Sequence, residues 1–274
     1  LKTRFNYETG PYQGYTLDQK NFKWLAKLDW NISQTHKLAF TYNGLDASKE
    51  KPAHPSAIGR RGPDYTTLQF RNSGYEILNK LHSFSTELKS TLKNNAANKL
   101  RVVYTSFRDK RNPFSSAFPA INISKYNVRY IVAGHEPFSI HNRLNQDALQ
   151  ITNDFNPYRG KHSFTFGASY ETFKFGNSFN LVAYSPATFF DGDVQLFKDS
   201  VPVGGGYVFN FGSGGVPLDV FADVAKNRAL ADKWTWYYLK VGQLSVYAQD
   251  EIQAGKKLKF TVGLRIDKPL YFDK

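Results

Sequence analysis

Residues 243–267, QLSVYAQDEIQAGKKLKFTVGLRID, alternate between apolar and polar side chains on both sides of a short turn at 254–256. The apolar set comprises Leu244, Val246, Ala248, Ile252, Leu258, Phe260, Val262, Leu264 and Ile266. Successive side chains of a β-strand point to opposite faces. The stretch therefore predicts two antiparallel strands with one apolar and one polar face. The wall of a membrane barrel requires this pattern, with lipid outside and a polar lumen inside.

Three more pairs of alternating segments precede this one. They are expected at 20–32 and 36–46, at 80–92 and 99–109, and at 143–155 and 161–175. Short turns at 33–35, 94–98 and 156–160 join the strands of each pair, whereas long connections, among them 110–142 and 176–241, separate the pairs. The sequence thus predicts an all-β fold: part of an antiparallel transmembrane β-barrel, with about eight strands and long extracellular loops.

Two segments depart from this simple pattern. Val103 and Phe107 interrupt the alternation of the second pair, so its strands are the least regular. In the longest connection, residues 218–233 have apolar side chains at spacings that predict a short helix. A connection of this length is usually functional, and in a large barrel it belongs to the outer side, where loops capture ligands.

A soluble β-sandwich is the structural alternative, because its strands also alternate. Sandwich strands are usually about five or six residues long, whereas these patterns run about twice that length. No run of about 18 apolar residues is present, which excludes a transmembrane helix but not a barrel. The aromatic content of 16% fits the aromatic girdles of a barrel. The membrane barrel is therefore the favoured interpretation.

The net charge of +13 indicates an affinity for polyanions or simply well-solvated loops. The basic residues are spread along the chain and match no nucleic-acid reader motif, so no nucleic-acid partner is expected. Phosphate groups of lipopolysaccharide are the alternative polyanion. A soluble basic β protein that binds a polyanion stays open as a further alternative at this point.

No catalytic, metal or cofactor site is expected. Cysteine is absent. His135, Glu136 and His141 lack the spacing of a helical zinc motif, and Pro137 opposes a helix there. Asp191 and Asp193 resemble only half of a calcium loop. Neither a Ser/His/Asp set nor a catalytic pair of carboxylates can be assembled, so the chain is not expected to be an enzyme.

Five side chains are candidates for contact with a ligand or with lipopolysaccharide. His54, Arg60 and Arg61 fall in a loop rich in proline and glycine, where cationic groups can meet phosphate or another anion. Trp234 and Trp236 precede the last strand pair, so they can form part of an aromatic girdle or a stacking surface for a ligand. Solvated loop residues are the simpler interpretation of the first three.

The hairpin at 243–267 resembles the mid-barrel hairpin of TonB-dependent outer-membrane receptors. That hairpin typically contains an aromatic strand ending in Gln-Asp-Glu and a second strand ending in Gly-Leu-Arg-Tyr-Asp. The matching positions here are Tyr247, Gln249, Asp250 and Glu251, then Gly263, Leu264, Arg265, Ile266 and Asp267. Ile266 stands where tyrosine is usual. The stretch NISQTHKLAFTYN at 31–43 resembles another hairpin of this family.

Two further stretches are similar to the large receptors that carry an N-terminal carboxypeptidase-regulatory-like domain. They are GHEPFSIHNRLNQDALQITNDFN at 134–156 and HSFTFGASYE at 162–171. The resemblance implies that residues 1–274 are part of a single receptor barrel domain, and that the plug domain is not in this sequence. The chain begins at Leu1 and contains no methionine, so we expect it to be a piece of a longer protein.

The resemblance also implies a function and its partners. Such receptors actively import a peptide, a glycan or a chelated metal across the outer membrane of a Gram-negative bacterium. The expected partners are outer-membrane lipid and lipopolysaccharide, the TonB complex acting through the unseen plug, and a surface lipoprotein. A passive barrel, or a scaffold that binds a partner protein without transport, is the alternative.

Overall fold

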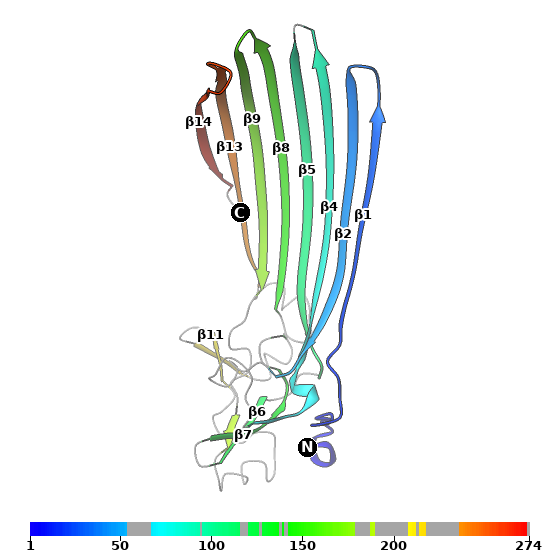
Figure 1. Cartoon of the computed structure of the whole chain (residues 1–274). Coiled ribbons are helices and arrows are strands. Elements are labelled where there is room, and N and C mark those ends of the chain that lie inside the picture. Colours follow the sequence, from blue (N-terminus) through cyan, green and yellow to red (C-terminus); the bar gives the residue numbers. More distant parts are fainter. Residues whose placement is uncertain are drawn as a thin grey trace.

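Eight long strands form one continuous antiparallel sheet in the computed structural model (Figure 1). The structure describes residues 1–53, 67–93, 95–115, 120–125, 128–136, 139, 142–178, 187–189, 208–211, 214–217 and 236–272. The sheet contains, in spatial order, β1 (Gln19–Asn31), β2 (His36–Lys51), β4 (Tyr75–Leu92), β5 (Ala96–Pro113), β8 (Arg143–Arg159), β9 (His162–Ser178), β13 (Tyr237–Gln253) and β14 (Lys259–Tyr271). The predicted strands are all confirmed, and each pairs with its neighbour in the chain order expected of a meander.

Tight turns connect β1 to β2, β4 to β5, β8 to β9 and β13 to β14, and all four lie at the same end of the sheet (Figure 1). In the first turn the Ser33 hydroxyl accepts hydrogen bonds from the backbone N–H groups of Thr35 and His36, at 3.2 and 3.1 Å. Asn95 and Gly160 adopt positive φ angles of 53° and 62°, which glycine and asparagine tolerate best. These two conformations allow a sharp reversal of the chain.

Two predicted turns are longer than the turns in the structure. The segment 94–98 was expected as a turn, but β5 already begins at Ala96. Likewise 156–160 was expected as a turn, yet β8 continues to Arg159. Pro157, which has no N–H to donate, is accommodated opposite Ala96 in the register. The left-handed residue beside each reversal removes the need for a longer loop.

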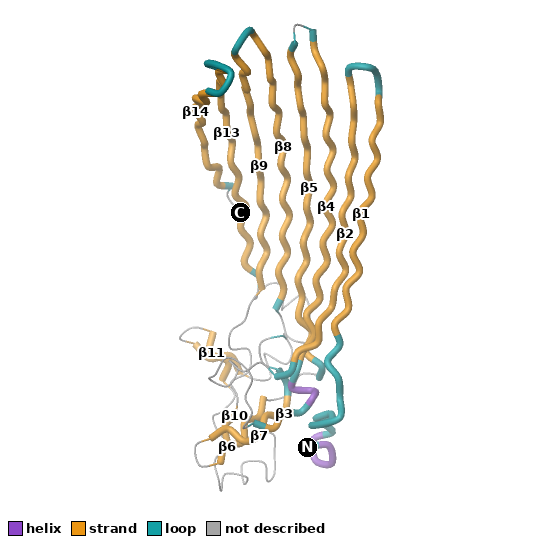
Figure 2. The backbone as a smooth tube through the Cα atoms, in the orientation of Figure 1, coloured by secondary structure: helices purple, strands orange, loops and turns teal. Residues whose placement is uncertain are grey.

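The connections at the other end contain short elements that were predicted as loop (Figure 2). A four-stranded sheet has the order β10 (Ala187–Phe189), β6 (Ala120–Lys125), β7 (Val128–Gly134) and β3 (Leu68–Gln69), and two of its three pairs are parallel. The hairpin of β11 (Val208–Phe211) and β12 (Gly214–Pro217) and the short helices α1 (Lys2–Phe5) and η2 (Arg71–Ser73) complete the described elements. The helix predicted at 218–233 lies outside the described residues.

The strands are longer than a membrane requires. They contain 13 to 18 residues, whereas a tilted spanning strand needs about 9–11. At about 3.3 Å per residue, the six central strands extend about 20 Å beyond the hydrocarbon core. Because the tight turns lie together at one end, this extra length falls at the end of the long connections.

An ion pair ties the first long connection to the sheet. The Arg71 guanidinium donates to Glu50 Oε1 at 2.9 Å, and the Asp18 backbone N–H donates to Glu50 Oε2 at 3.1 Å. The same guanidinium lies 4.6 Å from the Phe114 ring centroid. The Glu50 and Arg71 side chains are only 19% and 31% exposed, so solvent screens this pair less than a surface pair.

Replacing Glu50 with glutamine is therefore expected to loosen this attachment by about 1.5–3 kcal/mol, the usual value for a hydrogen bond to a charged group. Limited trypsin digestion of the full-length protein should then cut the 52–74 connection faster. Asp29→Asn is the control, because Asp29 pairs with Lys27 on an exposed surface where such pairs contribute little. Equal cleavage rates in the two variants would contradict the assignment.

Candidate functional site

The register of the sheet sorts the side chains into two faces. Residues directly opposite each other in an antiparallel pair lie on the same face. One row across the sheet joins Phe40, Thr86, Val102, Ile151, Tyr170 and Leu244. We call the face that contains this row the band face, and the opposite face the lumen face. Each strand contributes alternate residues to the two faces.

The band face is apolar over the part of the sheet that lies toward the tight turns. Its exposed side chains include Phe22, Leu28, Trp30, Phe40, Phe84, Leu244, Val246, Phe260, Val262, Leu264 and Ile266. Val262 and Leu264 are 67% and 69% exposed. A contiguous apolar surface of this kind marks a contact with another molecule or with a membrane. Its position on long alternating strands identifies lipid as the contact.

The lumen face at the same level is polar and internally hydrogen-bonded. Arg265 Nη2 donates to Ser245 Oγ at 2.9 Å, and Arg265 Nε donates to Asp267 at 2.9 Å. The Tyr247 hydroxyl donates to Asp154. Tyr247 lies flat across Gly167, its direct neighbour in the register. These side chains satisfy one another and suit a water-filled or protein-filled lumen.

Toward the long connections the apolar residues change faces. One row of the lumen face there joins Leu45, Leu81, Phe107, Gln146, Phe175 and Leu239, and we call it the vestibule row. The Phe173 and Phe175 ring centroids lie 6.2 Å apart beside it. The irregularity expected at Phe107 is therefore an ordered exchange between the faces, because beyond the membrane the band face no longer meets lipid. Val103 lies on the lumen face at the level of the band, between Ser85 and Gln150 in the register.

The vestibule row is a surface that the sequence analysis missed. The sequence contains one signal for this surface: along each long strand, the apolar residues shift from one set of alternate positions to the other. The shift can be interpreted only once the register between the strands is known. An apolar wall at the mouth of the lumen can contact apolar parts of a ligand, since binding sites are mostly apolar with a few polar groups.

Most predicted contact residues lie outside the described part of the chain. His54, Arg60, Arg61 and Trp234 are among them. Trp236 is described, and its ring stacks on Tyr238 with centroids 5.6 Å apart and an interplanar angle of 16°. Tyr238 belongs to the band face, opposite Gly176. Contact of Trp236 with a ligand or with lipopolysaccharide stays a prediction.

The polar residues near the end of β7 are packed against neighbouring loop segments. His135 and Glu136 are buried, and the His135 Nδ1 atom lies 2.9 Å from Ser115 Oγ. Ser73 Oγ donates to the Gly134 carbonyl at 3.0 Å. Burial raises the pKa of Tyr7 to about 12, and a hydrogen bond with Ser115 opposes part of that rise. These contacts hold together the segments around Tyr7, Ser73, Ser115 and His135.

Metal ligands do not gather anywhere in the described residues: no three His, Cys, Asp or Glu side chains come together there. His141, Asp191 and Asp193 lie outside that part of the chain. In the described part, no helix is both long enough and apolar enough to cross a membrane.

Comparison with known proteins identifies the fold. The family described as outer membrane beta barrel domain matches residues 3–272. The outer membrane transporter YddB from Escherichia coli has a similar structure, with a TM-score of 0.56 and 12% identity over 92% of this chain. The ferripyoverdine receptor of Pseudomonas aeruginosa, bound to ferripyoverdine, gives 0.50 and 11% over 92%. The FpvAI–pyocin S2 complex gives 0.51 and 12%, also over 92%.

At these identities the likeness to solved structures shows the fold alone. This chain covers only 28% of the YddB chain and 31% of each of the other two chains, so it spans less than a third of the structures that it matches. No curated protein matches the sequence.

Proposed function

This chain belongs to the outer membrane beta-barrel domain family, and from that premise we propose that it forms part of the wall of a TonB-dependent receptor. Its location is the outer membrane of a Gram-negative bacterium, and its family is one of barrels rather than enzymes. The proposed activity is the energised import of a ligand too large for porins, such as a peptide, a glycan or a chelated metal.

The observation that carries the proposal is the pair of surfaces on one sheet. The band face offers lipid a continuous apolar surface, and the lumen face is polar inside the membrane and apolar at its mouth. A passive aqueous pore does not need apolar side chains such as Leu81, Phe107 and Phe175 at its entrance. A ligand-binding vestibule needs them, because they contact the apolar parts of a ligand. The exposed band also opposes the soluble polyanion-binding alternative.

Residues 1–274 are proposed to be one part of a single, larger barrel. β1 and β14 are the two edges of the sheet and are not paired with each other. Backbone groups in lipid must be hydrogen-bonded, so further strands have to close the wall between these edges. This chain covers only 28% of the YddB chain, which supports the same proposal. An N-terminal plug and a carboxypeptidase-regulatory-like domain are predicted for the remainder.

The proposed partners follow from this arrangement. Outer-membrane lipid and lipopolysaccharide surround the band face. The TonB complex would act through the plug, and a surface lipoprotein could cover the vestibule. The hairpin at 243–267, with its Gln-Asp-Glu and Gly-Leu-Arg sequences, supports membership of the receptor class.

A liposome-swelling experiment separates a plugged receptor from a passive barrel. The full-length protein is reconstituted into liposomes, which are then diluted into isotonic sucrose. A plugged receptor is expected to give no more swelling than protein-free liposomes, and removal of the plug should give rapid swelling. Rapid sucrose entry through the intact protein would refute the gated receptor and favour the passive alternative.

Growth competition tests active import and the class of ligand. The parent strain competes with a strain lacking the gene in media where a glycan, a peptide or a ferric chelate is the sole source of carbon, nitrogen or iron. A defect in one medium identifies the ligand class. Loss of the advantage when TonB is deleted is expected, and its persistence would contradict energised import.

A further inference from the structure

The band face changes abruptly from apolar to cationic just beyond the membrane band. On β5, β8, β9 and β13, all of whose residues are described, the outward positions there include five cations and a single carboxylate, Asp147. The cations are Arg108, Lys110, Arg143, Lys174 and Lys240. On these four strands the surface next to the outer leaflet is therefore positive, whereas β2 and β4 place the carboxylates Asp46, Glu50 and Glu76 on the same face.

Four of these cations form two directly opposed pairs, which the sheet itself disfavours. Lys174 lies directly opposite Lys240 in the register, and Lys110 likewise lies opposite Arg143. Like charges at directly opposed positions destabilise a sheet. Such pairs are tolerated most easily when an anion from outside the chain neutralises them.

Asp147 does not neutralise the lysine pair, because other groups already engage it. The Arg108 guanidinium donates to both Asp147 oxygens, at 2.8 and 3.0 Å, and the Tyr104 hydroxyl donates to Oδ1 at 3.0 Å. Lys174 and Lys240 form no ion pair with any residue that the structure describes.

Lysines on the lumen face provide a contrast. Lys37 lies opposite Lys89, and Lys89 lies opposite Lys99. Lys89 forms an ion pair with Glu87 at 2.9 Å, and Lys99 forms one with Asp154 at 3.2 Å. Each row thus contains a carboxylate, but Asp154 pairs with its opposed lysine, Lys99, whereas Asp147, which lies directly opposite Lys174, pairs with Arg108 instead.

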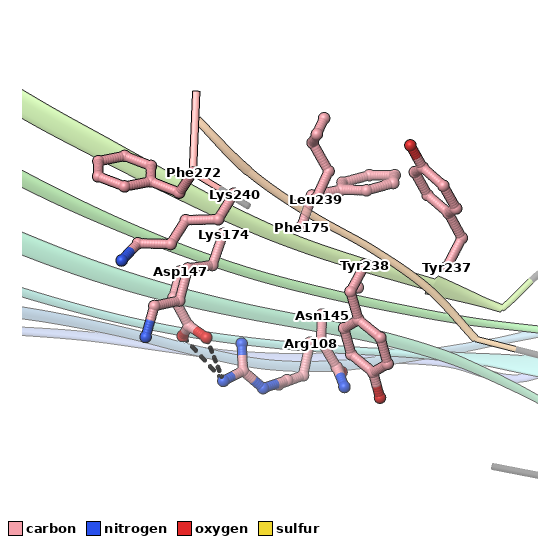
Figure 3. Close-up of a pocket in the computed structure, with 11 residues that line it drawn as sticks. Arg108, Asn145, Asp147, Lys174, Phe175, Tyr237, Tyr238, Leu239, Lys240 and Phe272 are labelled. Atoms are coloured by element: carbon pink, nitrogen blue, oxygen red, sulfur yellow. Dashed lines mark hydrogen bonds and ion pairs between the residues drawn. The ribbon is translucent and has the colours of Figure 1, made fainter. Parts of the chain in front are cut away.

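A cavity of about 340 Å³ opens at the cationic patch (Figure 3). Arg108, Asp147 and Tyr238 lie on one side of the strands in this view, and Phe175 and Leu239 extend to the other. Lys240 also lines the cavity, with its Nζ atom 4.3 Å from the Phe272 ring centroid. The aliphatic part of the Lys240 side chain and the Phe272 ring give the cavity an apolar rim beside its cationic groups.

The patch lies at the depth of lipid headgroups. On the band face, Lys174 and Lys240 each stand four residues beyond the end of the apolar run of their strands, at Tyr170 and Leu244. That separation is about 13 Å along a strand. A ligand with acyl chains against the apolar band would place its headgroup beside these lysines.

We propose that Lys174, Lys240 and Arg108 form a binding site for the phosphate of a phosphorylated glycolipid in the outer leaflet. The site uses charge-assisted hydrogen bonds from the two lysines, while Arg108 orders the cavity through Asp147. The proposal requires an outer-membrane location but not a particular imported ligand, so it stands or falls separately from the import function.

The test is a titration of the full-length protein in detergent with bisphosphorylated lipid A, followed by native mass spectrometry. Each cation near an anionic lipid surface contributes about fivefold to binding, so K174Q/K240Q is expected to bind about 25-fold more weakly. The matched control is K37Q/K89Q, which removes two directly opposed lysines from the lumen face. Heat-modifiable gel mobility confirms that each barrel is folded.

Two further probes distinguish binding of a lipid phosphate from binding of free phosphate. Dephosphorylated lipid A should bind the parent as weakly as the double variant binds the bisphosphorylated form. Inorganic phosphate at millimolar concentration should not displace lipid A. Unchanged lipid A binding by K174Q/K240Q would overturn the site, and displacement by inorganic phosphate would overturn its assignment to a lipid.

Discussion

Replacement of Leu264 by arginine is expected to lower the free energy of unfolding by about 2–4 kcal/mol, the cost of a cation on the lipid face near the middle of the bilayer. Leu264 is 69% exposed in the middle of the apolar run of β14. Its register partner is Ala248, and the nearest carboxylate of the band face on β13, Asp250, lies diagonally toward the tight turn and already pairs with His162. The guanidinium would therefore meet hydrocarbon.

The matched control is Gln249→Arg, one residue away in the register and on the opposite face. Gln249 lies opposite Gly263 and Thr165 on the lumen face, where the longer side chain meets small neighbours and polar groups. Reversible urea unfolding of the full-length protein in phospholipid vesicles gives both values. A penalty for Gln249→Arg as large as that for Leu264→Arg would show that the two faces are wrongly assigned.

Replacement of Gly167 by valine is expected to cost about 1–3 kcal/mol, as for other substitutions that overfill a packed site. A Cβ atom at Gly167 would lie 2.1 Å from Tyr247 Cζ. The tyrosine ring would have to leave its position, and its hydroxyl would lose Asp154. Arg265, which lies 5.5 Å from the same ring centroid, would lose a cation–π contact.

A double-mutant cycle distinguishes this clash from a general effect of valine. In the Tyr247→Ala background the ring is absent, so Gly167→Val should cost less, with a coupling energy in the range of about 0.5–3 kcal/mol. Gly255→Val is a second control, since nothing lies within 4 Å of a Cβ atom at Gly255. Full additivity of the two substitutions would contradict the proposed packing.

The positions of the eight strands could be predicted from the sequence because lipid on one face and water on the other enforce a period of two. The hairpin at 243–267 shows this most clearly, since its alternation persists to Ile266. The lengths of several strands were underestimated for a related reason. Outside the bilayer the constraint disappears, so the residues that extend β4 back to Tyr75 and β5 forward to Pro113 show no simple alternation.

The candidate surfaces were predictable only in part. The apolar band follows directly from the alternation, but the vestibule row and the lysine pair depend on which residues of distant strands lie opposite each other. Phe107 and Phe175 are 68 positions apart in the chain, and a single sequence gives no register between them. The contact residues proposed in loops, such as His54 and Arg60, stay predictions.

The central claim is that β14 and its neighbours face lipid on one side and a polar lumen on the other. This chain contains no cysteine, and any cysteine elsewhere in the full-length protein is first replaced by serine. Single cysteines are then placed at each position from 260 to 267 and spin-labelled in vesicles. Collision with oxygen should peak at positions 260, 262, 264 and 266, and collision with a water-soluble nickel complex should peak at the positions between them. Equal nickel accessibility at both sets would contradict a membrane-spanning wall.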